Sequence, residues 1–173
     1  MTIRQNFTQA IWSAKKDDLS FSTLNKDITV DVAIIGGGIT GIMTAYYLRK
    51  QGQKVAVLEK SGVGFGTTGS STGNLYVPTG KFHKVLKKHG KNALYDVAKA
   101  RTDAMKLIEK LIAELNIDCE YEQVPWYNFS SASENDIDQV RLEKGAIQEL
   151  NIRHTDVVPK NFPFEASSFL GVP

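Results

Sequence analysis

The chain has 173 residues, of which 42% are hydrophobic and 23% are charged, and its formal net charge is +2. This composition is typical of a folded globular protein and excludes a disordered chain, and the length suffices for one domain with a core and part of a second. The positive excess is too small to indicate nucleic acid as a partner, and no basic cluster with interleaved aromatic residues supports one.

The cellular location is predicted from what the sequence does not contain. The only cysteine, Cys119, excludes a disulfide within the chain and fits a reducing compartment. Residues 1–20 lack the apolar stretch of a signal peptide, and no apolar run approaches the length of a membrane span. We therefore expect a cytoplasmic protein without a transmembrane segment.

The first elements in chain order predict a strand–helix–strand unit. Residues 1–29 are polar and are expected to form an N-terminal arm. Residues 30–35 (VDVAII) are apolar except for Asp31, which predicts a strand buried on both faces, as in a parallel sheet. A helix is expected over residues 39–51, ending at Gly52 in a left-handed cap. Residues 54–59 then predict a second buried strand that is parallel to the first.

Three glycines connect the first strand to the helix in the pattern Gly36-x-Gly38-x-x-Gly41. The first allows a sharp turn, the second lets a pyrophosphate approach the backbone, and the third lets the helix pack closely on the strand. The phosphates would face the N–H groups of the helix that begins near Ile39. Glu59 ends the second strand, 18 positions after Gly41, and can accept hydrogen bonds from both hydroxyls of an adenosine ribose. The pattern predicts a dinucleotide site, and the charge of Glu59 disfavours NADP.

The glycine pattern alone does not decide between NAD and FAD, and a glycine-rich turn in another α/β protein is the structural alternative. Residues 61–80 (SGVGFGTTGSSTGNLYVPTG) favour FAD, because their backbone N–H groups and hydroxyls can follow a second phosphate, the ribityl chain and the edge of a flavin. An NAD-binding domain of a dehydrogenase and a nucleotide-binding module without catalysis remain open as alternatives.

Helices are expected beyond this loop. Residues 82–89 predict a short helix that ends at Gly90, and Asn92 is placed to cap a longer one. The apolar residues of the longer helix recur at three-and-four spacing and should pack on a core. Ser133 and Asp136 form a capping pair for a further helix that carries Val140 and Ile147 on its apolar face.

A strand is expected over residues 118–130 (DCEYEQVPWYNFS), with Pro125 at an edge or a bulge. Trp126 and Tyr127 are interpreted as core residues of this sheet rather than as the lining of a substrate pocket. The three histidines, His83, His89 and His154, are too scattered to form a recognisable metal site, so no metal is expected.

The segments DVAIIGGGITGIMTAYYL, VLEK and GTTGSSTGNL resemble the FAD-dependent oxidoreductases of the D-amino-acid oxidase and glycine oxidase superfamily. Residues 84–124 are similar to the helical region of a bacterial branch that can carry a C-terminal Rieske domain. The resemblance implies an α/β fold: a Rossmann-like FAD-binding domain with a βαβ unit over residues 30–117, including a helical region at 81–117, and the start of an α+β substrate domain over 118–173.

The resemblance also implies the residues that bind FAD. Gly41 completes the glycine pattern, and the other positions follow the cofactor from pyrophosphate to flavin. They are Gly36, Gly38, Ile39 and Thr40 at the pyrophosphate, Glu59 and Lys60 at the adenosine ribose, and Thr67, Thr68, Thr72, Gly73, Asn74 and Leu75 along the phosphates and the flavin.

Members of this superfamily oxidise an amine or amino acid by hydride transfer to the flavin, which oxygen or another acceptor then reoxidises. They are longer than this chain, and their substrate-binding residues come late in the sequence. We therefore expect catalytic residues beyond Pro173, no turnover by the chain alone, and no Rieske domain within it. A homo-oligomer is left open.

Overall fold

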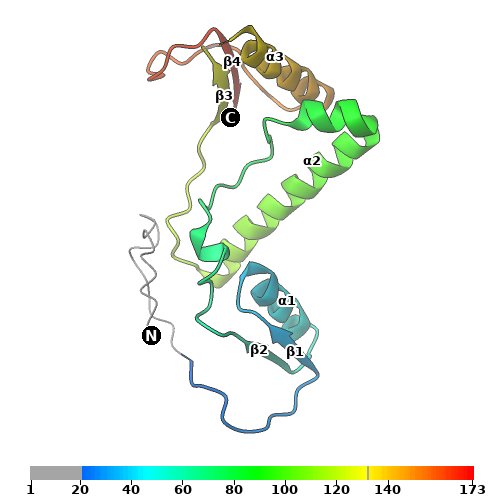
Figure 1. The fold of residues 1–173 in the computed structure, drawn as a ribbon, viewed down its shortest axis with the longest axis vertical. Helices are drawn as coiled ribbons and strands as arrows, with labels where there is room; N and C mark the ends of the chain where they lie inside the picture. The colour runs from blue at the N-terminus through cyan, green and yellow to red at the C-terminus, as the bar shows by residue number, and fades with distance from the viewer. Residues whose placement is uncertain (1–20, 132) are drawn as a thin grey trace, which may run out of the picture. The chain divides into compact units, whose positions relative to one another are not determined.

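The computed structural model describes residues 21–131 and 133–173, and these form a mixed α/β structure with two small sheets (Figure 1). Most of the expected N-terminal arm, residues 1–29, lies outside the described residues. By its internal contacts the chain divides into one unit that ends at Asn74 and a second unit from Leu75 to Pro173. The first unit contains the glycine turn, and the second contains the long helix and an antiparallel sheet.

Strand, helix and strand follow one another in the first unit, as β1 (Val32–Ile35), α1 (Ile39–Lys50) and β2 (Val55–Leu58). The two strands pair in parallel and α1 packs against both. The charged residue inside the apolar run, Asp31, accepts a 2.7 Å hydrogen bond from the backbone N–H of Lys54. Its carboxylate therefore ties the start of β1 to the start of β2.

Gly52 ends α1 as expected. Its φ is +83°, in the left-handed region that favours glycine. The N–H of Gly52 donates to the carbonyl of Arg49, and the N–H of Gln53 donates to the carbonyl of Leu48, each at 3.0 Å. This pair of bonds is a Schellman motif, which satisfies carbonyl groups at the end of the helix.

The expectation that the first strand is buried on both faces is wrong for this structure. The side chain of Ile35 is 82% exposed, whereas Val32 and Ile34 on the alternate positions are half-buried. The physical reason is that the sheet has two strands and α1 covers part of it. No residue of α1 is fully buried, and the side chain of Ile42 is 39% exposed.

The second unit consists of α2 (Phe82–Leu115), β3 (Trp126–Ser130), α3 (Glu134–Glu149) and β4 (Ser168–Val172). Gly90 adopts a φ of +80° and interrupts α2, so the predicted short helix does end there. Strands β3 and β4 pair antiparallel, and α3 packs against both strands and against α2. Among the described residues, neither α2 nor any other helix has the length and apolar character needed to cross a membrane.

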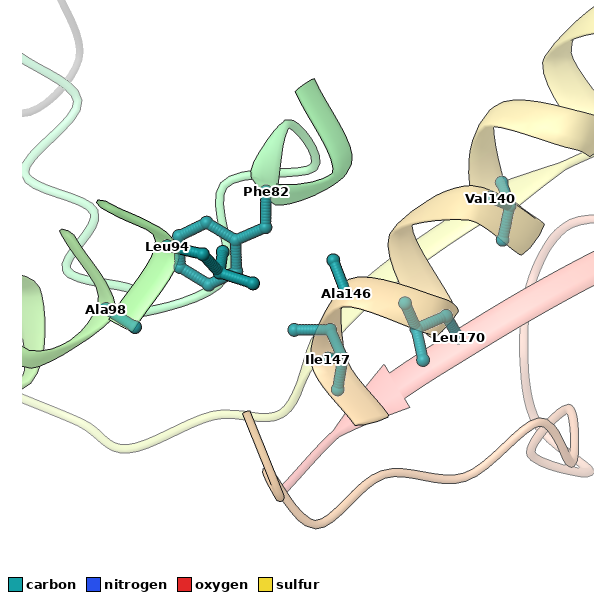
Figure 2. Close-up of a cluster of buried hydrophobic side chains, with 7 residues drawn as sticks. All are labelled: Phe82, Leu94, Ala98, Val140, Ala146, Ile147 and Leu170. Carbon is teal, nitrogen blue, oxygen red and sulfur yellow. The ribbon is translucent and has the colours of Figure 1, made fainter. Parts of the chain in front are cut away.

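The core of the second unit lies where α2, α3 and β4 meet (Figure 2). Its buried members are Phe82, Leu94, Ala98, Val140, Ala146, Ile147 and Leu170. Trp126 packs against this cluster, which confirms its assignment to the core. Tyr127 points to the other face of the strand, where it is 38% exposed and contacts the rings of Phe162 and Phe169.

The strand expected over residues 118–130 is shorter than the sequence indicated. It begins at Trp126, because β4 supplies partners only for the five residues from Trp126 to Ser130. Pro125, just before it, has no N–H to donate. The helix cap was predicted correctly: the hydroxyl of Ser133 accepts from the N–H of Asp136 at 3.3 Å and donates to its carboxylate at 2.8 Å.

A buried carboxylate that the sequence does not predict connects α3 to the first turn of α2. Glu143 is 0% exposed, and its two oxygens accept hydrogen bonds from the N–H groups of Phe82 and His83, each at 3.0 Å. The ring Nδ1 of His83 lies 2.7 Å from the same carboxylate. Glu143 therefore caps α2 from another helix.

Candidate cofactor site

The glycine turn between β1 and α1 requires glycine at two positions, for two different reasons. Gly36 has a φ of +105°, where a side chain would be strained, and its N–H donates to the carbonyl of Leu58 at 2.8 Å. A Cβ on Gly41 would lie 2.0 Å from the carbonyl oxygen of Gly36. The turn and the close approach of α1 to the strand therefore both depend on glycine.

The N-terminus of α1 faces the loop that follows β2. Gly38 is the N-cap residue, with extended backbone, no side-chain cap and no acidic residue in the first turn of the helix. The N–H of Ile39 donates to the hydroxyl oxygen of Thr68 at 3.0 Å. Helix N-termini carry partial positive charge and N–H donors, so an anion would be stabilised here.

Glu59 follows β2, and backbone N–H groups surround its carboxylate. One oxygen accepts from Gly37 at 2.7 Å, and the other accepts from Ser61 at 2.8 Å and from Gly62 at 3.5 Å. The hydrogen bond from Ser61 and then that from Gly37 lower the pKa of Glu59, because both stabilise the charged form. The carboxylate is therefore ionised at neutral pH, and it retains lone pairs for further donors such as sugar hydroxyls.

These groups surround one open pocket with a volume of about 380 Å³. This volume lies within the range of small-molecule sites. The lining residues are Gly38, Glu59, Ser61, Phe65, Gly66, Thr67 and Thr68.

The structure brings together part of the predicted site. Gly38, Glu59, Thr67 and Thr68 line the pocket, and the N–H of Ile39 donates to the hydroxyl of Thr68. Other predicted residues do not line this pocket. They are Gly36 and Gly41, which shape the turn behind it; Thr40, in the first turn of α1; Lys60, Thr72, Gly73 and Asn74, which are exposed; and Leu75, which begins the second unit.

Four residues of this site were not among the FAD-binding positions predicted one by one. Gly37 donates to Glu59, and a Cβ there would lie 3.2 Å from the Cβ of Glu59. Ser61, Phe65 and Gly66 line the pocket. The sequence did place them near the site: Gly37 stands between the first two glycines of the pattern, and Ser61, Phe65 and Gly66 belong to the segment 61–80 that favours FAD.

The residues present fit a dinucleotide such as FAD. The start of α1 and the hydroxyls of Thr67 and Thr68 suit phosphate oxygens, and the carboxylate of Glu59 suits ribose hydroxyls. Among the described residues that line the pocket, Glu59 is the only titratable one, and its carboxylate already accepts backbone hydrogen bonds. The described part of the site is therefore equipped to bind a nucleotide rather than to act as an acid or base on a substrate.

Comparison with known proteins agrees with this geometry. A family model described as "FAD dependent oxidoreductase" matches residues 31–165. A Bacillus subtilis protein named as a Rieske iron–sulfur protein, YhfW, is 33% identical over 95% of this chain and 32% of its own length. Gamma-glutamylputrescine oxidoreductase of Escherichia coli is 35% identical over 58% of the chain and 24% of its own length.

A shorter match is to D-amino acid dehydrogenase of Helicobacter pylori, which is 52% identical over 44 residues, or 25% of this chain and 10% of that protein. The chain thus spans about a third or less of these relatives. No solved structure matches the chain significantly.

Proposed function

The chain belongs to the family of FAD-dependent oxidoreductases, and we propose that it supplies the FAD-binding part of an enzyme that oxidises an amine or an amino acid. The names of two relatives, gamma-glutamylputrescine oxidoreductase and D-amino acid dehydrogenase, support this class of substrate. When bound, FAD would accept a hydride from the carbon next to the amine, and oxygen or another acceptor would reoxidise it.

One observation carries the proposal: the N-terminus of α1, the carboxylate of Glu59 and the hydroxyls of Thr67 and Thr68 surround the same pocket. In the proposed complex the N–H of Ile39 and the hydroxyl of Thr68 hold the pyrophosphate. Glu59 accepts hydrogen bonds from the adenosine ribose. Because the first turn of α1 contains no acidic residue, nothing in that turn repels the phosphates.

The remaining predicted residues keep their roles as proposals. Lys60 lies beside the ribose region, Thr40 at the pyrophosphate, and the segment from Thr72 to Leu75 along the phosphates and the flavin. In this proposal β1, α1 and β2 begin a Rossmann-like fold, residues 30–117 belong to the FAD-binding domain, and residues 118–173 begin an α+β substrate domain. The parallel pairing of β1 with β2 supports the Rossmann-like start, and the antiparallel pairing of β3 with β4 supports an α+β character for residues 118–173.

The visible absorption spectrum of the freshly purified protein tests the proposal. We expect a flavin band near roughly 450 nm, and FAD in the supernatant after heat release. For a colourless preparation, FAD is added and binding is followed by quenching of flavin fluorescence. A protein that binds NAD but not FAD under these conditions would contradict the proposal.

A further inference from the structure

The side chain of Arg101 on α2 hydrogen-bonds to the backbone near the end of the glycine-rich loop, residues 61–80. Its Nε donates to the carbonyl of Val77 at 3.0 Å, and its Nη2 donates to the carbonyl of Tyr76 at 2.7 Å. The guanidinium also lies over the ring of Tyr76, 5.3 Å from the ring centroid. One side chain thus holds two consecutive peptide groups and an aromatic ring that are 24 and 25 positions away in the sequence.

The backbone at Tyr76 and Val77 is also held by packing on the side that leads into α2. Val77 packs against the buried core cluster, and Pro78 is buried. On the other side the chain is exposed: Thr72, Gly73 and Asn74 are open to solvent, and Gly73 adopts a φ of +69°. The hydrogen bonds of Arg101 therefore lie where the exposed loop ends and the packed chain begins.

The exposed residues next to this point are those proposed to lie along the phosphates and the flavin of the cofactor. Asn74 is two residues before Tyr76, so the backbone of Asn74 can lie no further than about 7 Å from the backbone of Tyr76, to which Arg101 is bonded. Fixing Tyr76 and Val77 thereby restricts the positions that Asn74 and Leu75 can take. Ordering a loop before binding lowers the entropic cost of binding its ligand.

We propose that Arg101 is a positioning residue for FAD, which holds the end of the cofactor loop so that the segment from Thr72 to Leu75 is preorganised along the flavin. The inference rests on the proposed function, because it assigns that segment to the cofactor. Arg101 is thereby added to the proposed cofactor-binding residues, although it belongs neither to the glycine pattern, nor to the loop, nor to the pocket lining.

The test is a substitution that removes the planar guanidinium group of Arg101 but keeps its positive charge. In Arg101→Lys the ammonium is a point charge on a flexible stem and lacks the fixed spacing with which Nε and Nη2 of Arg101 reach two carbonyls. Arg141→Lys is the matched control, because Arg141 is 71% exposed on α3 and pairs with Asp138 on the surface. The full chain of each variant is compared by its FAD dissociation constant, from quenching of flavin fluorescence, and by hydrogen exchange of residues 72–77 without FAD.

We expect the FAD dissociation constant of Arg101→Lys to rise about tenfold, the effect of losing roughly one charged hydrogen bond. Exchange at residues 72–77 should become faster, whereas Arg141→Lys should change neither quantity. Faster exchange with an unchanged dissociation constant would show that Arg101 supports the fold alone, and would overturn the proposal. Unchanged exchange would overturn it as well.

Two further results separate this inference from the function on which it rests. If the wild-type chain does not bind FAD, the proposed function fails and the positioning role fails with it, whatever the exchange shows. If the wild type binds FAD and Arg101→Lys binds it equally well, only the positioning role fails. Arg101→Gln, which keeps one amide donor, replaces Arg101→Lys if that variant does not fold, with the same expectations.

Discussion

The hydroxyl oxygen of Thr68 accepts a 3.0 Å hydrogen bond from the backbone N–H of Ile39, the first residue of α1. The two residues are 29 positions apart, so the loop after β2 folds back over the start of the helix. The same N–H is a donor that the proposed pyrophosphate site needs. Binding of FAD would therefore require Ile39 to exchange one acceptor for another, and Thr68 to turn its hydroxyl toward the phosphate.

Replacing Thr68 by valine has two opposing effects on FAD binding. It removes an acceptor that competes for the N–H of Ile39, but water replaces that acceptor at an exposed site, so the gain is below about 0.5 kcal/mol. It also removes a hydroxyl donor to a charged phosphate, which costs about 1.5–3 kcal/mol. The second effect is larger, and we expect the FAD dissociation constant of Thr68→Val to rise at least about tenfold.

The control for this experiment is Thr68→Ser, which keeps the hydroxyl and should bind FAD within about threefold of the wild type. Both variants are titrated with FAD by fluorescence quenching. Binding by Thr68→Val as tight as that of Thr68→Ser would show that the hydroxyl does not contact the cofactor.

Gly41→Ala should disrupt the turn and the cofactor site together. The added Cβ would lie 2.0 Å from the carbonyl oxygen of Gly36, and this atom belongs to the backbone and cannot rotate away. We expect α1 to shift from β1, with a loss of about 1–3 kcal/mol in stability and a loss of measurable FAD binding.

Gly145→Ala is the matched control for this substitution. Gly145 lies inside α3, and a Cβ there would meet no atom within 4 Å. Alanine should stabilise that helix by up to about 1 kcal/mol and leave FAD binding unchanged. The melting temperature and the FAD dissociation constant are measured for the two variants. A Gly41→Ala protein with the melting temperature and the dissociation constant of the wild type would refute the steric argument.

The local features of the fold could be predicted because their causes lie within a few residues of each other. Gly52 closes α1 and Ser133 caps α3 through bonds to neighbours in the sequence. The spacing from Gly41 to Glu59 placed the helix start and the carboxylate at one pocket, because a helix and a short strand fix that distance.

Features that depend on distant partners could not be predicted in this way. The burial of Glu143 depends on Phe82 and His83, about sixty positions earlier, and a glutamate in a helix is exposed by default. The start of β3 depends on where β4 ends at Val172. The exposure of Ile35 depends on the number of strands in the sheet. This number cannot be predicted from the sequence of one strand.

Glu143→Gln should destabilise the second unit strongly. The carboxylate is fully buried and accepts from two backbone N–H groups and from the ring of His83. A glutamine offers one acceptor oxygen, so at least one buried donor loses its partner and the new amide N–H groups need partners of their own. Losses of this kind cost about 3 kcal/mol.

Urea unfolding of Glu143→Gln measures this loss, with Asp138→Asn as the control. Asp138 is 61% exposed and its ion pair with Arg141 lies on the surface, so its replacement should cost less than about 1 kcal/mol. Equal midpoints for the two variants would mean that Glu143 is not the buried cap of α2.

The carboxylate of Glu59 should make the cofactor site sensitive to acid. Hydrogen bonds from Ser61 and then Gly37 lower its pKa in the folded chain below the ordinary value of 4.5. For a group with a lowered folded pKa, the stabilisation is present above the unfolded pKa and is lost as the pH falls through the folded pKa. The loop at residues 59–62 should therefore still have its hydrogen bonds at pH 4.5 and lose them as the pH falls through the lowered pKa of Glu59.

NMR titration of the amide signals of Gly37 and Ser61 measures this directly. We expect both signals to shift with one midpoint below pH 4.5, and FAD affinity to fall over the same range, because a protonated carboxyl accepts ribose hydroxyls less well. Glu59→Gln should remove that midpoint while signals elsewhere titrate as before. A midpoint at or above 4.5 in the wild type would mean that the N–H groups of Ser61 and Gly37 do not hold the carboxylate in solution.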